Sequence, residues 1–477
     1  MTAAFCFYDL ETFGTTPGRD RIAQFAVQRT NAQFEPTAEP EVEYCQPSLW
    51  PLPEPGACVV TGITPQIAQA RGLPEWRFCE ALLAALAGPN TCVVGYNSSQ
   101  FDDPFVQHLC WRNFQDPYAW HWRDGNSRWD LLTLVRAAFA LRPQGLQWPS
   151  KPDGEPSLKL EDLARANQLP QPKAHDALGD VTATLALAQL LQQAQPKLTQ
   201  YALSLRNKRQ VLDLLEPGQP LAHVSGKIPA RHRCLTLWLP VVASATNANQ
   251  WQGLDLRGPL TPWLEWSAEE LAEAIYSRSE DLPEGLERPL FKGVTVNRAP
   301  FLADPATIDA HSAQQAALDV DACLAKADAI RDHWDIIVAK VRAIEAIRPD
   351  YADRDVEARL YDGFVPEADR RLSDEIVATP LEDLASFSGR FQDARLEELL
   401  FRFRARHAAE TLSAAEQEEW QRLSRQQVEF APHGGLSLED FMTQVQVMGQ
   451  QAQGEDKRVL GELWRWGQDT ARSVGLL

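Results

Sequence analysis

The octet Phe5-Cys6-Phe7-Tyr8-Asp9-Leu10-Glu11-Thr12 constrains the fold more than any other part of the chain. Apolar and aromatic residues lead into two acids at positions i and i+2, which is typical of a buried strand that ends at a charged tip. Side chains at i and i+2 of a strand share a face, so Asp9 and Glu11 should point the same way. Because the two carboxylates repel each other, a cation such as Mg²⁺ or Mn²⁺ is expected between them. The octet alone leaves open a turn at Asp9 with a solvated Glu11.

The length and composition predict a soluble protein of several domains. A chain of 477 residues is too long for one core and suggests two to four domains. No signal peptide or membrane span is evident, and the eight cysteines show no C-x-x-C spacing, so we expect buried thiols in a reducing cytoplasm. The net charge of −19 argues only weakly against a polyanionic partner, because a nucleic-acid enzyme needs no more than a local basic groove.

The hydrophobic pattern divides the chain into three predicted domains, at residues 1–196, 197–348 and 349–477. The first alternates strands and helices and predicts a mixed sheet flanked by helices. Its expected strands are 5–12, 21–27, 41–45 and 91–96, and its expected helices are 80–86, 104–114, 130–141, 162–167 and 176–193.

The two later domains have different patterns. Residues 233–242 and 291–296 indicate strands, whereas 267–277 and 314–346 indicate helices, so a small β-barrel with helical additions is expected. Turn-rich breaks fall at 247–250 and 280–285. The last domain shows helical spacing only and predicts an all-α bundle, with helices at 396–406, 414–430, 438–450 and 457–473.

Further acids stand at the ends of predicted elements. Asp102 lies between a buried strand and a helix, and Asp180 falls one turn into the helix that follows His175. Together with Asp9 and Glu11, these acids can bind two divalent ions about 3.5–4 Å apart, an arrangement suited to in-line attack on phosphorus. His175 can accept the proton of the attacking water near neutral pH. Taken singly, Asp102, His175 and Asp180 are more often helix caps or solvated side chains, and only the combination is specific.

These residues resemble the DEDDh 3′→5′ exonucleases, which have a ribonuclease H-like fold, through Asp9-x-Glu11, Asn97-x3-Phe101-Asp102 and His175-x4-Asp180. Longer stretches are similar to the bacterial exonuclease I family: Tyr8-Asp9-Leu10-Glu11-Thr12-Phe13-Gly14-Thr15, Thr61-Gly62-Ile63-Thr64-Pro65-Gln66, Asn113-Phe114-Gln115-Asp116-Pro117-Tyr118-Ala119-Trp120, Asn126-Ser127-Arg128-Trp129-Asp130-Leu131-Leu132 and Val224-Ser225-Gly226. The resemblance implies an SH3-like domain and a helical domain after the nuclease domain. It also implies that Asp9, Glu11, Asp102 and Asp180 ligate two Mg²⁺ ions, with Mn²⁺ as a substitute, and that His175 is the general base. Asp103 fits the ligand position less well than Asp102.

Aromatic and basic residues suggest how a nucleic-acid strand is held, because single-strand binders combine stacking platforms with a basic track. Tyr118 and Trp122 lie in a polar loop broken by proline and are the preferred stacking candidates, although most aromatic residues of this region should be core. Further candidate contacts are Arg136, Lys159, Tyr201 and Lys208. The basic run 402–407 suggests either a channel wall or a solvated helix face.

The expected activity is stepwise, processive removal of 5′-mononucleotides from the 3′ end of single-stranded DNA, in DNA repair and recombination. By resemblance, the acidic C-terminal tail of single-stranded DNA-binding protein is a partner, with Arg142 and Tyr201 as candidate contacts. We expect a cytoplasmic monomer with no membrane contact. Two alternatives stay open: an RNA 3′-trimming nuclease of the same group, since the scissile phosphodiester is the same, and a catalytically silent scaffold that binds single strands.

Overall fold

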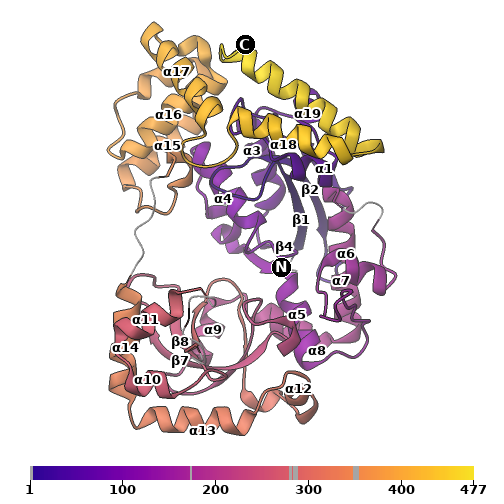
Figure 1. Cartoon of the computed structure of the whole chain (residues 1–477), viewed down its shortest axis with the longest axis vertical. Coiled ribbons are helices and arrows are strands. Elements are labelled where there is room, and N and C mark those ends of the chain that lie inside the picture. The colour runs from indigo at the N-terminus through magenta and orange to yellow at the C-terminus, as the bar shows by residue number, and fades with distance from the viewer. Residues whose placement is uncertain (1–3, 172–174, 279–281, 283–287, 348–353) are drawn as a thin grey trace. The chain divides into compact units, whose positions relative to one another are not determined.

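The computed structural model describes residues 4–171, 175–278, 282, 288–347 and 354–477, and the chain forms two compact units. The first unit comprises residues 1–127, 171–182 and 351–477, and the second comprises 128–170 and 183–350. The first unit therefore joins the two ends of the chain, which are indigo and yellow in Figure 1. The predicted limits 1–196, 197–348 and 349–477 follow the chain rather than these units and stay a prediction.

A mixed sheet forms the centre of the first unit. Its strands run in the order β3-β2-β1-β4-β5. Strand β1 is antiparallel to β2 and parallel to β4, so the sheet is mixed, as the sequence predicted. The strands are β1 (Ala4–Thr12), β2 (Ile22–Thr30), β3 (Glu41–Tyr44), β4 (Thr91–Gly95) and β5 (Ser127–Asp130), of which β5 begins at the last residue of the stretch 1–127 and continues into the second unit. The short strand β5 was not predicted.

Helices from both ends of the chain cover this sheet. The helices of the first unit are α1 (Pro55–Thr61), α2 (Pro65–Arg71), α3 (Glu75–Leu86), α4 (Asp102–Arg112), α15 (Glu367–Ala378), α16 (Ala394–His407), α17 (Ala414–Phe430), α18 (Leu438–Gln451) and α19 (Gly454–Ser473). Shorter 3₁₀ turns are η1 (Ala119–His121), η2 (Arg123–Gly125), η6 (Val356–Ala358), η7 (Leu381–Phe387) and η8 (Ala409–Thr411). Helix α7 (Ala177–Ala194) begins in this unit. The four predicted C-terminal helices are all present, as α16 to α19.

The alternation of side chains along β1 assigns its residues to two faces. Cys6, Tyr8 and Leu10 are buried in one core with residues of α3 and α4. Phe5 and Phe7 point to the other face, where each packs edge-on against Phe34. Since Asp9 and Glu11 continue the series of Phe5 and Phe7, the two acids share a face, as the i, i+2 spacing predicted.

The last two helices of the chain complete a second core with the N-terminal sheet. Phe441 and Leu463, on α18 and α19, are fully buried together with Phe13, Leu52 and Ile63. Figure 1 shows α18 and α19 lying beside α1. The C-terminal helices are therefore part of the core of the first unit.

A buried ion network also ties the C-terminal segment to the sheet. Glu357 on η6 is 2% exposed, and its carboxylate lies 2.5 Å from both the Arg21 and the Arg406 guanidinium groups. Arg402 contacts the same carboxylate at 3.5 Å and is buried. The prediction that residues 402–407 form a channel wall or a solvated face is therefore wrong for Arg402, because its charge is neutralised inside the unit.

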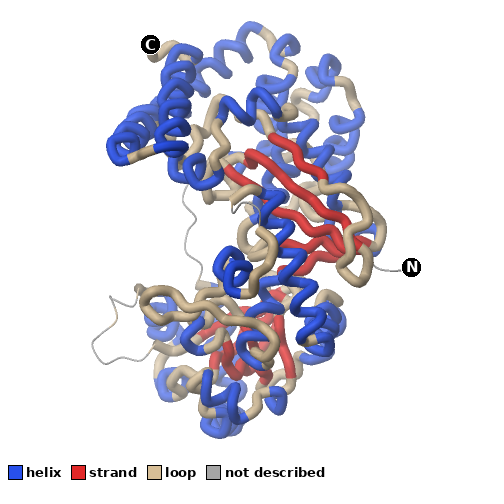
Figure 2. The backbone as a smooth tube through the Cα atoms, turned by 90° about the vertical axis from the view of Figure 1, so that its right-hand side faces the viewer, coloured by secondary structure: helices blue, strands red, loops and turns tan. Residues whose placement is uncertain are grey.

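The second unit contains an antiparallel sheet in the order β10-β6-β7-β8-β9, and Figure 2 shows the strands of each sheet in red with helices in blue. Its strands are β6 (Leu221–Val224), β7 (Leu235–Ala243), β8 (Gln250–Asp255), β9 (Phe291–Thr295) and β10 (Phe301–Ala303). Its helices are α5 (Leu131–Leu141), α6 (Leu160–Ala166), α8 (Pro196–Ser204), α9 (Lys208–Leu214), α10 (Thr261–Glu265), α11 (Ala268–Tyr276), α12 (Ala310–Gln315), α13 (Val320–Arg331) and α14 (Trp334–Ala346). The unit also contains the 3₁₀ turns η3 (Ala230–His232) and η5 (Pro305–Thr307), as well as residues 183–194 of α7. Only β7 and β9 were predicted among the strands.

The helix expected over 314–346 is interrupted. Asp319 accepts a hydrogen bond from the Ala322 backbone N–H at 2.9 Å and caps a new helix, α13, after α12 has ended at Gln315. A second break at 332–333 separates α13 from α14. Side-chain capping by aspartate thus starts a new helix where hydrophobic spacing alone predicted a continuous one.

In the part of the chain that the structure describes, no helix is long and apolar enough to cross a membrane.

Candidate active site

Three acids gather at the end of strand β1 and the start of helix α7. Asp9, Glu11 and Asp180 each offer a carboxylate oxygen, and these oxygens all lie within 4.8 Å of one another. Asp9 and Glu11 come from one face of β1, whereas Asp180 lies in the first turn of α7. All three residues belong to the first unit.

The fourth predicted acid, Asp102, lies next to this group on the first turn of α4. It is buried, and its Oδ1 accepts a hydrogen bond from the Leu10 backbone N–H at 3.2 Å. Leu10 stands between Asp9 and Glu11, so this bond holds Asp102 against the same part of β1. Asp102 is not among the three acids whose oxygens lie within 4.8 Å of one another.

Asp103 has a different partner. It is buried, and its Oδ1 accepts a hydrogen bond from the Tyr8 hydroxyl at 2.6 Å. Tyr8 points to the face of β1 opposite to Asp9 and Glu11. Asp103 therefore helps to fix α4 against the sheet, whereas Asp102 faces the acid group.

The negative charges of the carboxylates in this site lie close together and repel one another. Burial raises the pKa of Asp9 well above its usual value, and the neighbouring charges of Asp102, Glu11 and Asp180 raise it further. Burial also raises the pKa of Asp180, against a hydrogen bond from Gln171 that lowers it. Without a cation, the full set of negative charges is therefore costly to maintain.

The approach to α7 brings His175 to Asp180. His175 is exposed and has a positive φ of 57°, and its backbone hydrogen bond and its charge both lower the pKa of Asp180. The backbone N–H of Asp180 donates to the Asp176 carbonyl at 3.0 Å, so the helix begins as the sequence predicted. His175 thus lies at the edge of the acid group.

The donor set fits a hard divalent cation. Carboxylate oxygens are the ligands that Mg²⁺ and Mn²⁺ prefer, and three of them converge here. A cation bound to these oxygens would remove the repulsion that raises the pKa of Asp9.

Gln171 is a residue of the site that was not predicted from the sequence. Its Nε2 donates a hydrogen bond to Asp180 Oδ1 at 2.8 Å and so orients the carboxylate. A glutamine nine residues before an acid, in a loop, carries no periodic signal that could have identified it.

The two preferred stacking residues are exposed in the loop that follows α4. Tyr118 is 38% exposed and Trp122 is 58% exposed, whereas Trp120 between them is buried in the core. The Arg123 guanidinium lies 5.9 Å from the Trp122 ring centroid. Tyr118 and Trp122 are thus available for contact, and their role in binding stays a prediction.

The other residues predicted to contact the nucleic-acid strand lie in the second unit. Arg136 is half-buried, and its guanidinium is so close to Gly226 that a Cβ atom there would come within 2.6 Å of it. Lys208 donates to Asn249 Oδ1 at 2.6 Å, and the side chain of Lys159 is 69% exposed. All three residues belong to the second unit, and their role in binding stays a prediction.

Arg142 and Tyr201, the predicted partner contacts, both reach the segment around β10. The Tyr201 hydroxyl donates to the Leu302 carbonyl at 2.7 Å, and Arg142 donates to the Thr307 carbonyl at 3.3 Å. The Arg142 side chain is 41% exposed. The two side chains thus border one stretch of the second unit.

Three family models match successive parts of the chain: an exonuclease model over residues 6–188, an exonuclease I SH3-like domain over 206–344 and an exonuclease I C-terminal domain over 354–470. The mixed sheet with its acid group and these matches define an exonuclease, a hydrolase that cleaves nucleic acid. Exodeoxyribonuclease I of Escherichia coli (strain K12) is 38% identical over 472 residues, which cover 98% of each chain. The chain belongs to the exodeoxyribonuclease I family, and the resemblance found in the sequence is confirmed.

Solved structures agree with this assignment. The crystal structure of E. coli exonuclease I in complex with a dA16 oligonucleotide has a TM-score of 0.93 and 38% identity and covers 98% of this chain and 100% of that chain. A crystal structure of SSB/exonuclease I in complex with an inhibitor has a TM-score of 0.90 and 37% identity, with coverage of 98% and 100%. The predicted fold, a ribonuclease H-like exonuclease domain followed by SH3-like and helical parts, is thereby confirmed.

Proposed function

We propose that this exonuclease removes 5′-mononucleotides stepwise from the 3′ end of single-stranded DNA, with two Mg²⁺ ions held by Asp9, Glu11, Asp102 and Asp180. The observation that carries the proposal is the convergence of Asp9, Glu11 and Asp180 oxygens within 4.8 Å, with Asp102 bonded to the residue between the first two. Mn²⁺ is an alternative ion, since it accepts the same oxygen ligands.

Different residues of the chain bind the metal ions, position the ligands and accept the proton. When bound, divalent ions at such a site activate water and stabilise the negative charge that develops at phosphorus. The four carboxylates supply the ligand oxygens, and Gln171 holds Asp180 in position. His175 is the general base, which accepts the proton of the attacking water, because imidazole titrates near neutral pH and this residue borders Asp180.

Single-stranded DNA is the proposed substrate. A structural relative at 38% identity over nearly the whole chain is described in complex with a dA16 oligonucleotide. Exposed Tyr118 and Trp122 supply aromatic faces on which bases can stack, and Arg136, Lys159, Tyr201 and Lys208 are proposed contacts further along the strand. A role in DNA repair and recombination, and processive digestion, belong to the same proposal.

Single-stranded DNA-binding protein is the proposed partner. The structural relative described as SSB/exonuclease I supports this pairing. Arg142 can receive a carboxylate of an acidic tail, and Tyr201 supplies an adjacent aromatic ring. That the protein is a cytoplasmic monomer stays a prediction.

Matched oligomers of DNA and RNA, single-stranded and duplex and labelled at the 5′ end, test the proposal. Incubation with Mg²⁺ should shorten single-stranded DNA from its 3′ end and release 5′-mononucleotides, and a chelator should stop the reaction. Faster digestion of RNA would identify an RNA-trimming enzyme, equal digestion of blunt duplex would refute strand selectivity, and binding without cleavage would identify a silent scaffold.

A further inference from the structure

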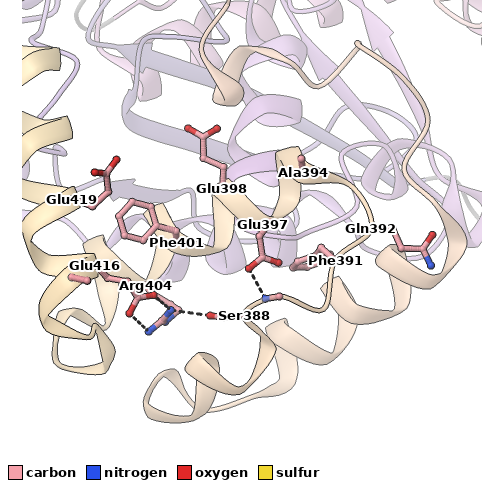
Figure 3. A pocket seen from close by; sticks show the side chains of 12 residues that line it. Ser388, Phe391, Gln392, Ala394, Glu397, Glu398, Phe401, Arg404, Glu416 and Glu419 are labelled. Carbon is pink, nitrogen blue, oxygen red and sulfur yellow. Dashed lines mark hydrogen bonds and ion pairs between the residues drawn. The ribbon is translucent and has the colours of Figure 1, made fainter.

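A groove opens between helices α16 and α17 in the C-terminal part of the first unit. It has a volume of about 700 Å³ and is lined by α16, α17 and the loop that joins η7 to α16 (Figure 3). Phe391 and Phe401 give it an apolar floor and are both half-buried. Phe391 is held in place by stacking on Phe114, and Phe401 by an edge contact with Trp420.

The rim of the groove is acidic. Four glutamates line it, Glu397, Glu398, Glu416 and Glu419, against a single arginine, Arg404. Arg404 is 2% exposed and is neutralised by Glu416 at 2.6 Å, so it presents no free charge to an incoming molecule. Among the residues that line the groove, glutamates thus outnumber arginines by three.

Two of these carboxylates are open to solvent. The side chains of Glu398 and Glu419 are 46% and 50% exposed. Glu398 pairs with Arg402, which is shared with Asp355 and Glu357, and Glu419 pairs with Arg422 in an exposed ion pair that an incoming cation can replace at little cost. Glu397 adds a buried oxygen, Oε2, that has no hydrogen-bond partner among the described residues.

We propose that this groove docks a short basic segment of a partner protein, in which lysine or arginine side chains flank a bulky apolar residue. The apolar residue would cover Phe391 and Phe401, and the cationic side chains would pair with Glu398 and Glu419. Charge complementarity selects this occupant. A nucleic-acid strand is disfavoured by the same excess of negative charge, so the groove is separate from the substrate site and does not depend on the proposed function.

Fluorescence anisotropy with the full-length protein tests this docking. The probe is a labelled peptide of sequence Lys-Lys-Leu-Phe-Lys-Lys, compared with Glu-Glu-Leu-Phe-Glu-Glu and with Lys-Lys-Ser-Ser-Lys-Lys. The first peptide should bind and the two others should not, and its affinity should fall as salt is added. Equal binding of the basic and acidic peptides, or of the two basic peptides, would overturn the proposal.

A matched pair of variants locates the binding. Glu419 lines the groove, whereas the neighbouring exposed Glu418 does not. Glu419→Lys should weaken binding of the basic peptide about tenfold, or about 1.4 kcal/mol, whereas Glu418→Lys should change it little. Hydrolysis of single-stranded DNA should be unaffected in both variants, which checks the fold. The same loss in both variants would overturn the site, and concentration-dependent dimerisation that Glu419→Lys abolishes would assign the groove to a second copy of the chain instead.

Discussion

The Tyr8 hydroxyl donates a hydrogen bond to Asp103 Oδ1 at 2.6 Å, and both side chains are buried. This bond separates the functions of two adjacent acids. Asp103 accepts its hydrogen bond on the face of β1 where Tyr8 packs. Asp102 accepts a hydrogen bond from the Leu10 N–H, and its negative charge helps to raise the pKa of Asp9. Sequence alone left the role of Asp103 open, and the contact assigns it to the packing of α4.

Substitution of Asp102 should therefore reduce activity, whereas substitution of Asp103 should reduce stability. Asp102→Asn should lower kcat about 100-fold or more, because it removes a proposed ligand charge, with little change in stability. Asp103→Asn should lower the free energy of unfolding by about 1–3 kcal/mol, because it weakens a buried hydrogen bond, and should retain most activity. Urea unfolding and single-turnover hydrolysis of a labelled oligomer measure the two effects. The reverse pattern would make Asp103 the functional acid.

His175 should matter for chemistry rather than for metal affinity. His175→Ala should lower kcat about 10²- to 10⁴-fold, the usual contribution of a general base, while Mn²⁺ binding measured by calorimetry stays close to that of the parent protein. His433→Ala, at an exposed position in the same unit, serves as the control. A near-normal rate in His175→Ala would show that another group accepts the proton.

The ion network at Glu357 should stabilise the first unit. Burial alone would raise the pKa of Glu357, but Arg21, Arg406 and Arg402 hold it well below its usual range. Glu357→Gln leaves these buried cations without their shared partner and should cost about 3–5 kcal/mol, measured by chemical unfolding. Glu367→Gln, which removes an exposed acid, should cost about 0–1 kcal/mol. Equal costs would mean that solvent reaches the network.

Stability should also fall in acid, in two windows. Burial lowers the pKa of His108 and of His407 from 6.5 to about 4, so the unfolded chain binds more protons between these pH values and stability declines as pH falls from 6.5 to 4. Burial would raise the pKa of Glu75, but Arg112 and Arg21 outweigh it and lower the pKa from 4.5 to about 2, which extends the decline from pH 4.5 to 2. Unfolding curves across pH 7 to 3 test this, and His108→Gln should reduce the slope between pH 6.5 and 4. An unchanged slope would mean that His108 titrates normally.

The sequence predicted those features that depend on local pattern. Helix α17 matches its expected bounds, because strong amphipathic spacing and the Ser413 capping box both act within a few residues. Strand β8 was missed, because its Gln-Trp-Gln-Gly-Leu-Asp sequence has little strand propensity and is stabilised by pairing with β7 and β9. The acids were identified by spacing and resemblance. The contact of Glu357 with Arg21, across more than three hundred residues of sequence, has no local signal.

The core shared by β2, α1, α18 and α19 has a consequence for synthesis of the protein. Leu460 and Leu463 are synthesised more than four hundred residues after Phe13 and Leu52, yet the four side chains are buried in one core. A nascent chain stalled before Leu438 should remain sensitive to protease, and protection equal to that of the full-length protein would contradict this. The exonuclease would then become protease-resistant only after α18 and α19 have been synthesised, and chains that terminate before these helices would be cleared rather than left active.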